Sequence, residues 1–169
     1  MFLESEDVAL RPVEEKDLEF YRELCLTEEA KDGMGVFYPS NMEDIQDGFE
    51  AKSKKENIVE FIIEYKGEKA GHVSIHKEGS CCDWRIYVTP EKTGQGIGTT
   101  AGELIIDYAF NQLEVHRFEG NFLEDNHASR KLHEKLGFKH ESTKRDFLYL
   151  NGEHKDLIVN SILREEWNK

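Results

Sequence analysis

Three strand-like segments in close succession constrain the fold of this chain more than any other feature. The segments cover residues 58–65, 70–76 and 81–88 and are rich in β-branched and aromatic side chains. Only short turns, around Gly67 and Gly79, separate them. Parallel strands need long crossovers, so short turns leave antiparallel pairing as the solution. The sequence therefore predicts three consecutive antiparallel strands.

Further patterns extend this unit on both sides. Strands are expected over residues 8–13, 115–123, 147–150 and 157–162. Helices are expected over residues 14–26, 41–55 and 127–136, and in the segment that contains Ala101, Leu104, Ile105 and Tyr108. The order β-α-α-β-β-β-α-β-α-β-β predicts an α+β fold, with a mixed, mostly antiparallel sheet of about six to seven strands and about four helices on both faces. Since no repeat or low-complexity linker interrupts the chain, residues 8–167 are expected to form a single domain.

Three local signals predict where elements begin and end. Ser40 and Glu43 have the spacing of a capping box, which would start the helix over residues 41–55. Gly137 suits the left-handed conformation that ends a helix. Asn151-Gly152 is a strong hairpin signal, and the return strand is expected to begin some residues later.

The charge balance restricts the partners. The chain has 22 Lys and Arg against 35 Asp and Glu, a formal net charge of −13. This acidic balance argues against nucleic acid and anionic membranes as partners and favours a cationic one. The N-terminus is acidic, and no apolar run approaches the roughly 18 residues of a membrane span. The cysteines and histidines lack metal-ligand spacing and the cysteines are expected to stay reduced, so the sequence predicts a cytoplasmic protein without a metal.

A glycine-rich stretch, Gly94-Gln95-Gly96-Ile97-Gly98, stands between a strand and an amphipathic helix. Glycines let backbone N–H groups approach an anion, and the helix dipole favours negative charge at the start of a helix. No Lys follows the glycines as a Walker loop requires, and the third glycine comes one position early for a dinucleotide fingerprint. The stretch predicts a phosphate-binding loop, and a nucleotide-binding protein is one alternative.

Two motifs resemble a known family. The stretch Val88–Gly98 resembles the acetyl-CoA pyrophosphate loop, Q/R-x-x-G-x-G/A, of the GNAT N-acetyltransferases. The stretch Asn126–Phe138 resembles the N-x-x-[AS]-x-x-x-Y-x-x-x-G-F helix of the same family. The resemblance covers residues 8–167. Its subgroup, which holds ribosomal-protein-alanine acetyltransferases and spermidine acetyltransferase, is indicated by Leu10-Arg11-Pro12 and by Asn151-Gly152 with Asp156 and Trp167.

Two positions depart from the family pattern. Thr93 stands where the loop motif has Gln or Arg, which removes one side-chain contact near the phosphates and leaves the backbone donors. His133 stands where many members have Tyr, so the phenol that would protonate the leaving thiolate is missing.

The resemblance implies an enzyme that transfers acetyl from acetyl-CoA directly to a primary amine. The acceptor would be a protein N-terminal amine, a polyamine or an aminoglycoside-like small amine. Backbone groups of the strand over residues 81–88 would polarise the carbonyl oxygen and pair with the pantetheine arm. The implied cofactor-binding residues are Ile86, Tyr87, Val88, Thr93, Gly94, Gln95, Gly96, Ile97, Gly98, Thr99, Asn126, Ser129 and His133.

Asp83, Ser129 and His133 are the candidate catalytic residues. Strict alternation places Asp83 on one face with Arg85 and Tyr87, unless a β-bulge shifts the strand. There its carboxylate could hold a cationic amine or accept its proton, or else pair with Arg85. A histidine with an ordinary pKa of ~6.5 suits a proton donor or acceptor, and Ser129 is expected to contact the cofactor or the thiol.

Alternatives stay open at this point. One is transfer to a nucleotide-sugar amine, and another is a non-catalytic acyl-CoA-binding module of the same fold. Phe37 and Tyr38 are candidates for lining the acceptor pocket. A homodimer is compatible with the sequence, which does not set the oligomeric state.

Overall fold

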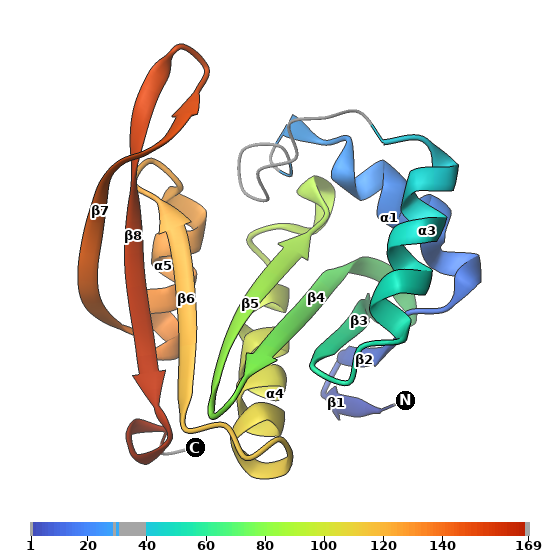
Figure 1. Cartoon of the computed structure of the whole chain (residues 1–169). Helices are drawn as coiled ribbons and strands as arrows, with labels where there is room; N and C mark the ends of the chain where they lie inside the picture. Colours follow the sequence, from blue (N-terminus) through green and yellow to red (C-terminus); the bar gives the residue numbers. More distant parts are fainter. Residues whose placement is uncertain (1, 29, 31–39, 168–169) are drawn as a thin grey trace.

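The computed structural model describes residues 2–28, 30 and 40–167, so Phe37 and Tyr38 lie outside the described residues. The described chain forms an eight-stranded sheet in the order β1-β2-β3-β4-β5-β6-β8-β7 (Figure 1). β5 and β6 run parallel, and the other neighbouring strands pair antiparallel. The strands are β1 (Leu3–Ser5), β2 (Val8–Pro12), β3 (Ile58–Tyr65), β4 (Glu68–Glu78), β5 (Cys81–Val88), β6 (Arg117–Leu123), β7 (Lys139–Leu150) and β8 (Glu153–Leu163).

Helices cover both faces of this sheet. They are α1 (Leu18–Cys25), α3 (Met42–Ser53), α4 (Ile97–Gln112) and α5 (His127–Leu136). α4 and α5 lie on one face, and α1 and α3 lie against β3 and β4 on the other (Figure 1). None of the helices in the described part is both long and apolar enough to cross a membrane. The predicted α+β class, with a mostly antiparallel sheet, is confirmed.

The main hydrophobic core lies under α4. Alternate residues of the central strands, among them Phe61, Val73 and Trp84, pack against Ile105 and Phe110 of that helix. These side chains have 7% or less of their surface exposed. Their burial fixes the register of β3, β4 and β5, because a shift by one residue would move the apolar side chains to the opposite face. The polar side chains of the same strands therefore face α1 and α3.

The sheet has one strand more than the six to seven that the sequence predicts. The unpredicted strand is β1, which pairs antiparallel with β2 through a tight turn with Glu6 at a φ of 50°. Leu3-Glu4-Ser5 is too short and too polar to show the alternating pattern of a strand.

The last two strands are longer than predicted. β7 starts at Lys139 and not near residue 147, and β8 starts at Glu153, directly after the turn. The expectation of a late return strand was therefore wrong, although Asn151 and Gly152 form the predicted turn with φ of 52° and 88°. Residues 139–147 are exposed, so no alternation of buried side chains marks this part of β7.

The capping box of α3 is shifted by one residue from the prediction. The Asn41 side chain accepts a hydrogen bond from the Asp44 N–H at 3.0 Å, and the Asp44 carboxylate accepts one from the Asn41 N–H at 2.9 Å. Asn41 and Asp44 therefore replace the predicted pair, Ser40 and Glu43, because Asn caps a helix as well as Ser does. The predicted first helix is likewise split into a 3-10 turn, η1 (Glu15–Asp17), and α1.

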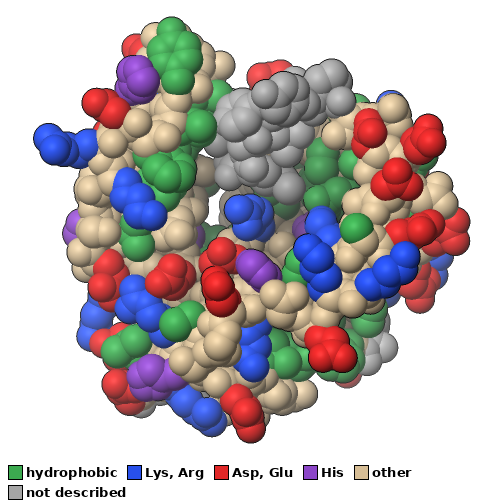
Figure 2. Space-filling view, in the orientation of Figure 1, with side chains coloured by type: hydrophobic (Ala, Val, Ile, Leu, Met, Phe, Trp, Pro, Cys, Tyr) green, Lys and Arg blue, Asp and Glu red, His purple; other side chains and the backbone are tan. Residues whose placement is uncertain are grey.

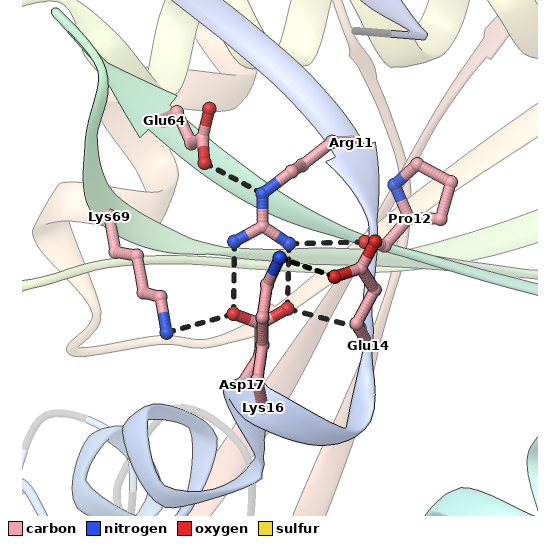
Figure 3. A network of polar contacts seen from close by, with 7 residues as sticks. All are labelled: Arg11, Pro12, Glu14, Lys16, Asp17, Glu64 and Lys69. Carbon is pink, nitrogen blue, oxygen red and sulfur yellow. Dashed lines mark hydrogen bonds and ion pairs between the residues drawn. The ribbon is translucent and has the colours of Figure 1, made fainter.

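A buried ionic network ties β2 to the start of α1 (Figure 3). Arg11 donates to both carboxylate oxygens of Asp17 at 2.6 and 2.9 Å and to Glu64 at 2.6 Å. Lys69 lies 2.8 Å from Asp17, whose side chain is fully buried. Burial alone would raise the pKa of Asp17, but the hydrogen bonds from Arg11 and Lys69 outweigh it and hold that pKa well below its usual range.

Candidate active site

The sheet splits between β5 and β6. These parallel strands pair only from Cys81 to Asp83 and from Arg117 to Glu119, and they diverge beyond this point (Figure 1). A cleft of about 220 Å³ opens there between β5, β6, the start of α4 and α5. The predicted cofactor residues that line it are Ile86, Tyr87, Val88, Gly98, Asn126, Ser129 and His133.

The side chains of Trp84 and His133 occupy the point where the strands separate. Trp84 is the first residue of β5 beyond the paired segment, and Gly120 is the first of β6. The imidazole of His133 lies against Gly120, where an added Cβ atom would stand 2.1 Å from Nε2. The Trp84 ring meets the imidazole edge-on, with ring centroids 5.7 Å apart. A residue larger than glycine at position 120 would therefore displace His133.

Both ring nitrogens of His133 have partners. The Trp84 indole N–H donates to Nε2 at 3.2 Å, so Nε2 is the acceptor and the ring proton is on Nδ1. Nδ1 donates to the backbone carbonyl oxygen of Ser129 at 2.7 Å. Burial lowers the pKa of His133 to about 4, against the opposing effect of the bond to the Ser129 carbonyl. Only 2% of the residue is exposed.

This environment argues against the predicted acid–base role of His133. A second ring proton would sit on Nε2 and point at the Trp84 N–H, which is itself a donor. The ring therefore stays neutral near pH 7 and cannot supply a proton to a leaving group. The predicted role assumed an ordinary histidine pKa, and the burial that lowers this pKa could not be read from the sequence.

The glycine-rich loop presents a row of open backbone donors at the start of α4. Gly94 and Gly96 have φ of 77° and 83°, and Gly96 is the N-cap residue of the helix. In the described structure the N–H groups of residues 94–98 have no hydrogen-bond acceptor, whereas the next N–H, that of Thr99, bonds to the Gly96 carbonyl at 3.0 Å. Such a row, with the helix dipole behind it, is suited to bind an anion. The Thr93 hydroxyl turns away from the row and donates to the Pro90 carbonyl at 2.8 Å.

Asn126 and Ser129 sit at the start of α5 on the cleft side. The Asn126 side-chain oxygen caps the helix by accepting from the Ser129 N–H at 3.0 Å. The Ser129 hydroxyl lies 3.3 Å from His133 Nδ1, but that nitrogen already carries a proton that it donates to the Ser129 carbonyl. The hydroxyl hydrogen is therefore available to a group in the cleft, as is the Asn126 amide nitrogen.

Asp83 lies apart from Ser129 and His133. It lines a second cavity, of about 300 Å³, between β3, β4 and β5 and the helices α1 and α3. Its Oδ1 oxygen is buried without a hydrogen-bond partner among the described residues. No ion pair joins Asp83 to Arg85, although the two side chains share a face. Arg85 lines both this cavity and the cleft.

Arg85, Gly120 and Trp84 were not identified from the sequence as residues of the candidate site. Alternation along β5 already placed Arg85 beside Asp83, which was the one available signal. Nothing local marks Gly120, because its role depends on a side chain from α5. Within the described residues, no group of three or more His, Cys, Asp or Glu side chains is arranged to hold a metal ion.

Comparisons with known proteins agree with this architecture. Residues 7–139 match the family model described as an acetyltransferase (GNAT) domain. The Bacillus subtilis protein named "Putative ribosomal N-acetyltransferase YdaF" is 31% identical over 96% of this chain and 94% of its own length. The spermidine N(1)-acetyltransferase of Escherichia coli K12 is 25% identical over 95% of this chain and 88% of its own.

A solved structure extends the likeness to the fold. The spermidine N-acetyltransferase from Vibrio cholerae, in complex with CoA and spermine, superimposes with a TM-score of 0.90 at 19% identity. The match covers 96% of this chain and 99% of that one. The split sheet and these matches define an N-acetyltransferase, an enzyme of the acyltransferase class. The chain belongs to the GNAT acetyltransferase family.

Proposed function

We propose that the chain uses acetyl-CoA as cosubstrate and transfers the acetyl group directly to a small primary amine. The observation that supports this most is the row of open N–H groups at residues 94–98, which suits the diphosphate of coenzyme A. The Vibrio cholerae protein whose fold this chain shares is described with CoA and spermine, which agrees with that assignment. In this proposal residues 8–167 act as one catalytic domain.

The pantetheine arm would run from this loop along the open edge of β5. Within the described residues no strand pairs with that edge beyond Asp83, so the backbone groups of Ile86 and Val88, which alternate with those bonded to β4, can pair with the arm as with an added strand. The free amide nitrogen of Asn126 would bond a pantetheine carbonyl. The arm would then bring the acetyl group to the point where β5 and β6 separate, next to Trp84.

The transfer itself needs few groups. An alkylammonium has a pKa of ~10.4, so the acceptor must lose one proton before its nitrogen can attack the carbonyl carbon. The Asp83 carboxylate would hold the ammonium and accept this proton directly or through water. A backbone N–H of β5 would stabilise the oxyanion. When the C–S bond breaks, the Ser129 hydroxyl would donate a hydrogen bond to the thiolate sulfur, which then takes the second amine proton through solvent.

His133 is a positioning residue in this scheme. Its neutral ring orients the Ser129 segment through the carbonyl bond and fills the space at the split of the sheet. Proton transfer therefore does not depend on the residue that replaces the family tyrosine.

Calorimetry and turnover together test the proposal. Desulfo-CoA, which cannot react, is titrated into the protein, and acetyl-CoA consumption is then followed with a panel of primary amines. Binding with a stoichiometry near one and turnover with at least one amine are expected. Absence of binding would refute the cofactor assignment, and binding without turnover on any amine would favour the non-catalytic module.

A further inference from the structure

The cavity at Asp83 has a mixed charge that restricts the acceptor. Positive, negative and histidine side chains lie together on the face between the β7–β8 strands and α3 (Figure 2). The cavity of about 300 Å³ is lined there by Lys52, Glu60, His72, Asp83 and Arg85, among others. A ligand can use only those charges that have no partner within the protein.

Most of the charges already have partners. Lys52 lies 2.9 Å from Glu60, and His72 lies 3.5 Å from the same oxygen. Glu119, which pairs with Asp83 across the parallel strands, lies 2.8 Å from Arg117. Each of these carboxylates is balanced by a neighbouring cation.

Asp83 and Arg85 are the exceptions. Asp83 keeps a buried oxygen without a hydrogen bond, and Arg85 is exposed and forms no hydrogen bond or ion pair within the described residues. The two Cα atoms are about 7 Å apart, because they are two residues apart on one strand. The cavity therefore offers one free negative and one free positive charge, both close to the split of the sheet.

We infer that the acceptor is an aminocarboxylate, with its ammonium on Asp83 and its carboxylate on Arg85. This inference rests on the proposed function and narrows its acceptor. A guanidinium binds a carboxylate through two parallel hydrogen bonds, which few other anchors match. A polyamine with three or four positive charges would meet only one free carboxylate and would bring a cation against Arg85. The cavity is thus matched to a ligand with one charge of each sign.

The test compares acceptors that differ only in the anionic group. Glycine, β-alanine and 4-aminobutyrate are each compared with the amino alcohol of equal length. Spermidine is tested alongside them as a polyamine acceptor, and a glycyl peptide as a polypeptide acceptor. For the best chain length, kcat/KM is expected to be at least about tenfold higher for the acid than for the alcohol. Calorimetric titration of the same acid into the desulfo-CoA complex should show the same preference without turnover.

Arg85→Gln should lower kcat/KM for the acid by about tenfold or more and leave the alcohol within about twofold. Arg85→Lys should restore part of the loss, because it keeps the charge. Arg145→Gln removes the same charge from an exposed position on β7 and should leave both substrates unchanged.

Two outcomes would overturn the inference in distinguishable ways. Equal rates for acids and alcohols, or a preference for spermidine that rises in Arg85→Gln, would refute the aminocarboxylate while leaving acetyl transfer intact. Absence of desulfo-CoA binding and of turnover with every acceptor would refute the proposed function together with it.

Discussion

The indole N–H of Trp84 donates a hydrogen bond to Nε2 of His133 across 3.2 Å, at the point where β5 and β6 separate. This bond and the Nδ1 bond to Ser129 fix the imidazole as a neutral ring. Because Nδ1 donates to the Ser129 carbonyl, the Ser129 hydroxyl hydrogen stays available to a group in the cleft. In the proposed mechanism these contacts are the reason why Ser129, and not His133, interacts with the leaving group.

A first prediction concerns the stability of the fold between pH 4 and 6.5. The folded-state pKa of His133, about 4, lies below the ordinary histidine pKa of 6.5, so the unfolded chain binds more protons in this window. The contribution of His133 is complete above pH 6.5 and is lost as the pH falls towards 4, by about 3 kcal/mol in total. Urea unfolding of wild type and His133→Phe at pH 7 and pH 5 should show a smaller pH effect in the variant.

His140→Gln is the matched control, because it removes an exposed histidine from β7. It should keep the wild-type pH dependence. If His133→Phe keeps it as well, His133 is not held neutral in the folded protein.

The sequence predicted the central antiparallel strands, α4 and α5 because their apolar side chains follow one period over many residues. The loop of open N–H groups in front of α4 was predictable because glycines in succession before a helix have few structural explanations. β1 and most of β7 could not be predicted, because an exposed strand has no alternating buried side chains in its sequence. The state of His133 depends on Trp84 and Gly120, which are 49 and 13 residues away along the chain, so no local pattern contains it.

A second prediction concerns the ionic network at Asp17. Asp17→Asn leaves Arg11 without its buried carboxylate and should lower the free energy of unfolding by about 3–5 kcal/mol. The folded-state pKa of Asp17 is depressed, so its contribution to stability is present above the ordinary aspartate pKa of 3.8 and is lost as the pH falls below that value. Urea unfolding at pH 7 and pH 3 should show a difference between wild type and variant that shrinks at the lower pH.

Asp7→Asn provides the comparison for Asp17→Asn. Asp7 lies 3.6 Å from Lys66 with 58% of its side chain exposed, so its loss should change stability by less than about 1 kcal/mol. Equal losses in the two variants would mean that the buried network does not stabilise the fold.

A third prediction isolates the loop in front of α4. Gly96 and Gly152 have φ of 83° and 88°, and an added Cβ meets no atom within 4 Å at either position. Alanine should therefore cost each variant a similar 1–2 kcal/mol of backbone strain. Only Gly96→Ala should raise the Kd for desulfo-CoA, by about tenfold, because relief of that strain reorients the open N–H groups. Calorimetry measures the Kd for desulfo-CoA in both variants. Equal Kd values in Gly96→Ala and Gly152→Ala would mean that the diphosphate does not bind at this loop.

The last prediction separates the two residues proposed to act on opposite sides of the reacting carbon. Ser129→Ala removes the hydrogen bond to the leaving sulfur and should lower kcat by about 10- to 100-fold, with little change in the KM of either substrate. Its stability should hold, because His133 is bound by the Ser129 carbonyl and not by the hydroxyl hydrogen. Ser129→Thr, which keeps a hydroxyl, should recover part of the rate.

Asp83→Asn should instead raise the KM for the amine and leave the Kd for desulfo-CoA within about twofold, because Asp83 lines the other cavity. Raising the pH increases the fraction of neutral amine in solution, so the rate defect of Asp83→Asn should shrink towards pH 10. The rate defect of Ser129→Ala does not depend on deprotonation of the amine and should therefore persist at pH 10. Steady-state kinetics of both variants from pH 7 to 10 would refute the assignment if the two profiles respond alike.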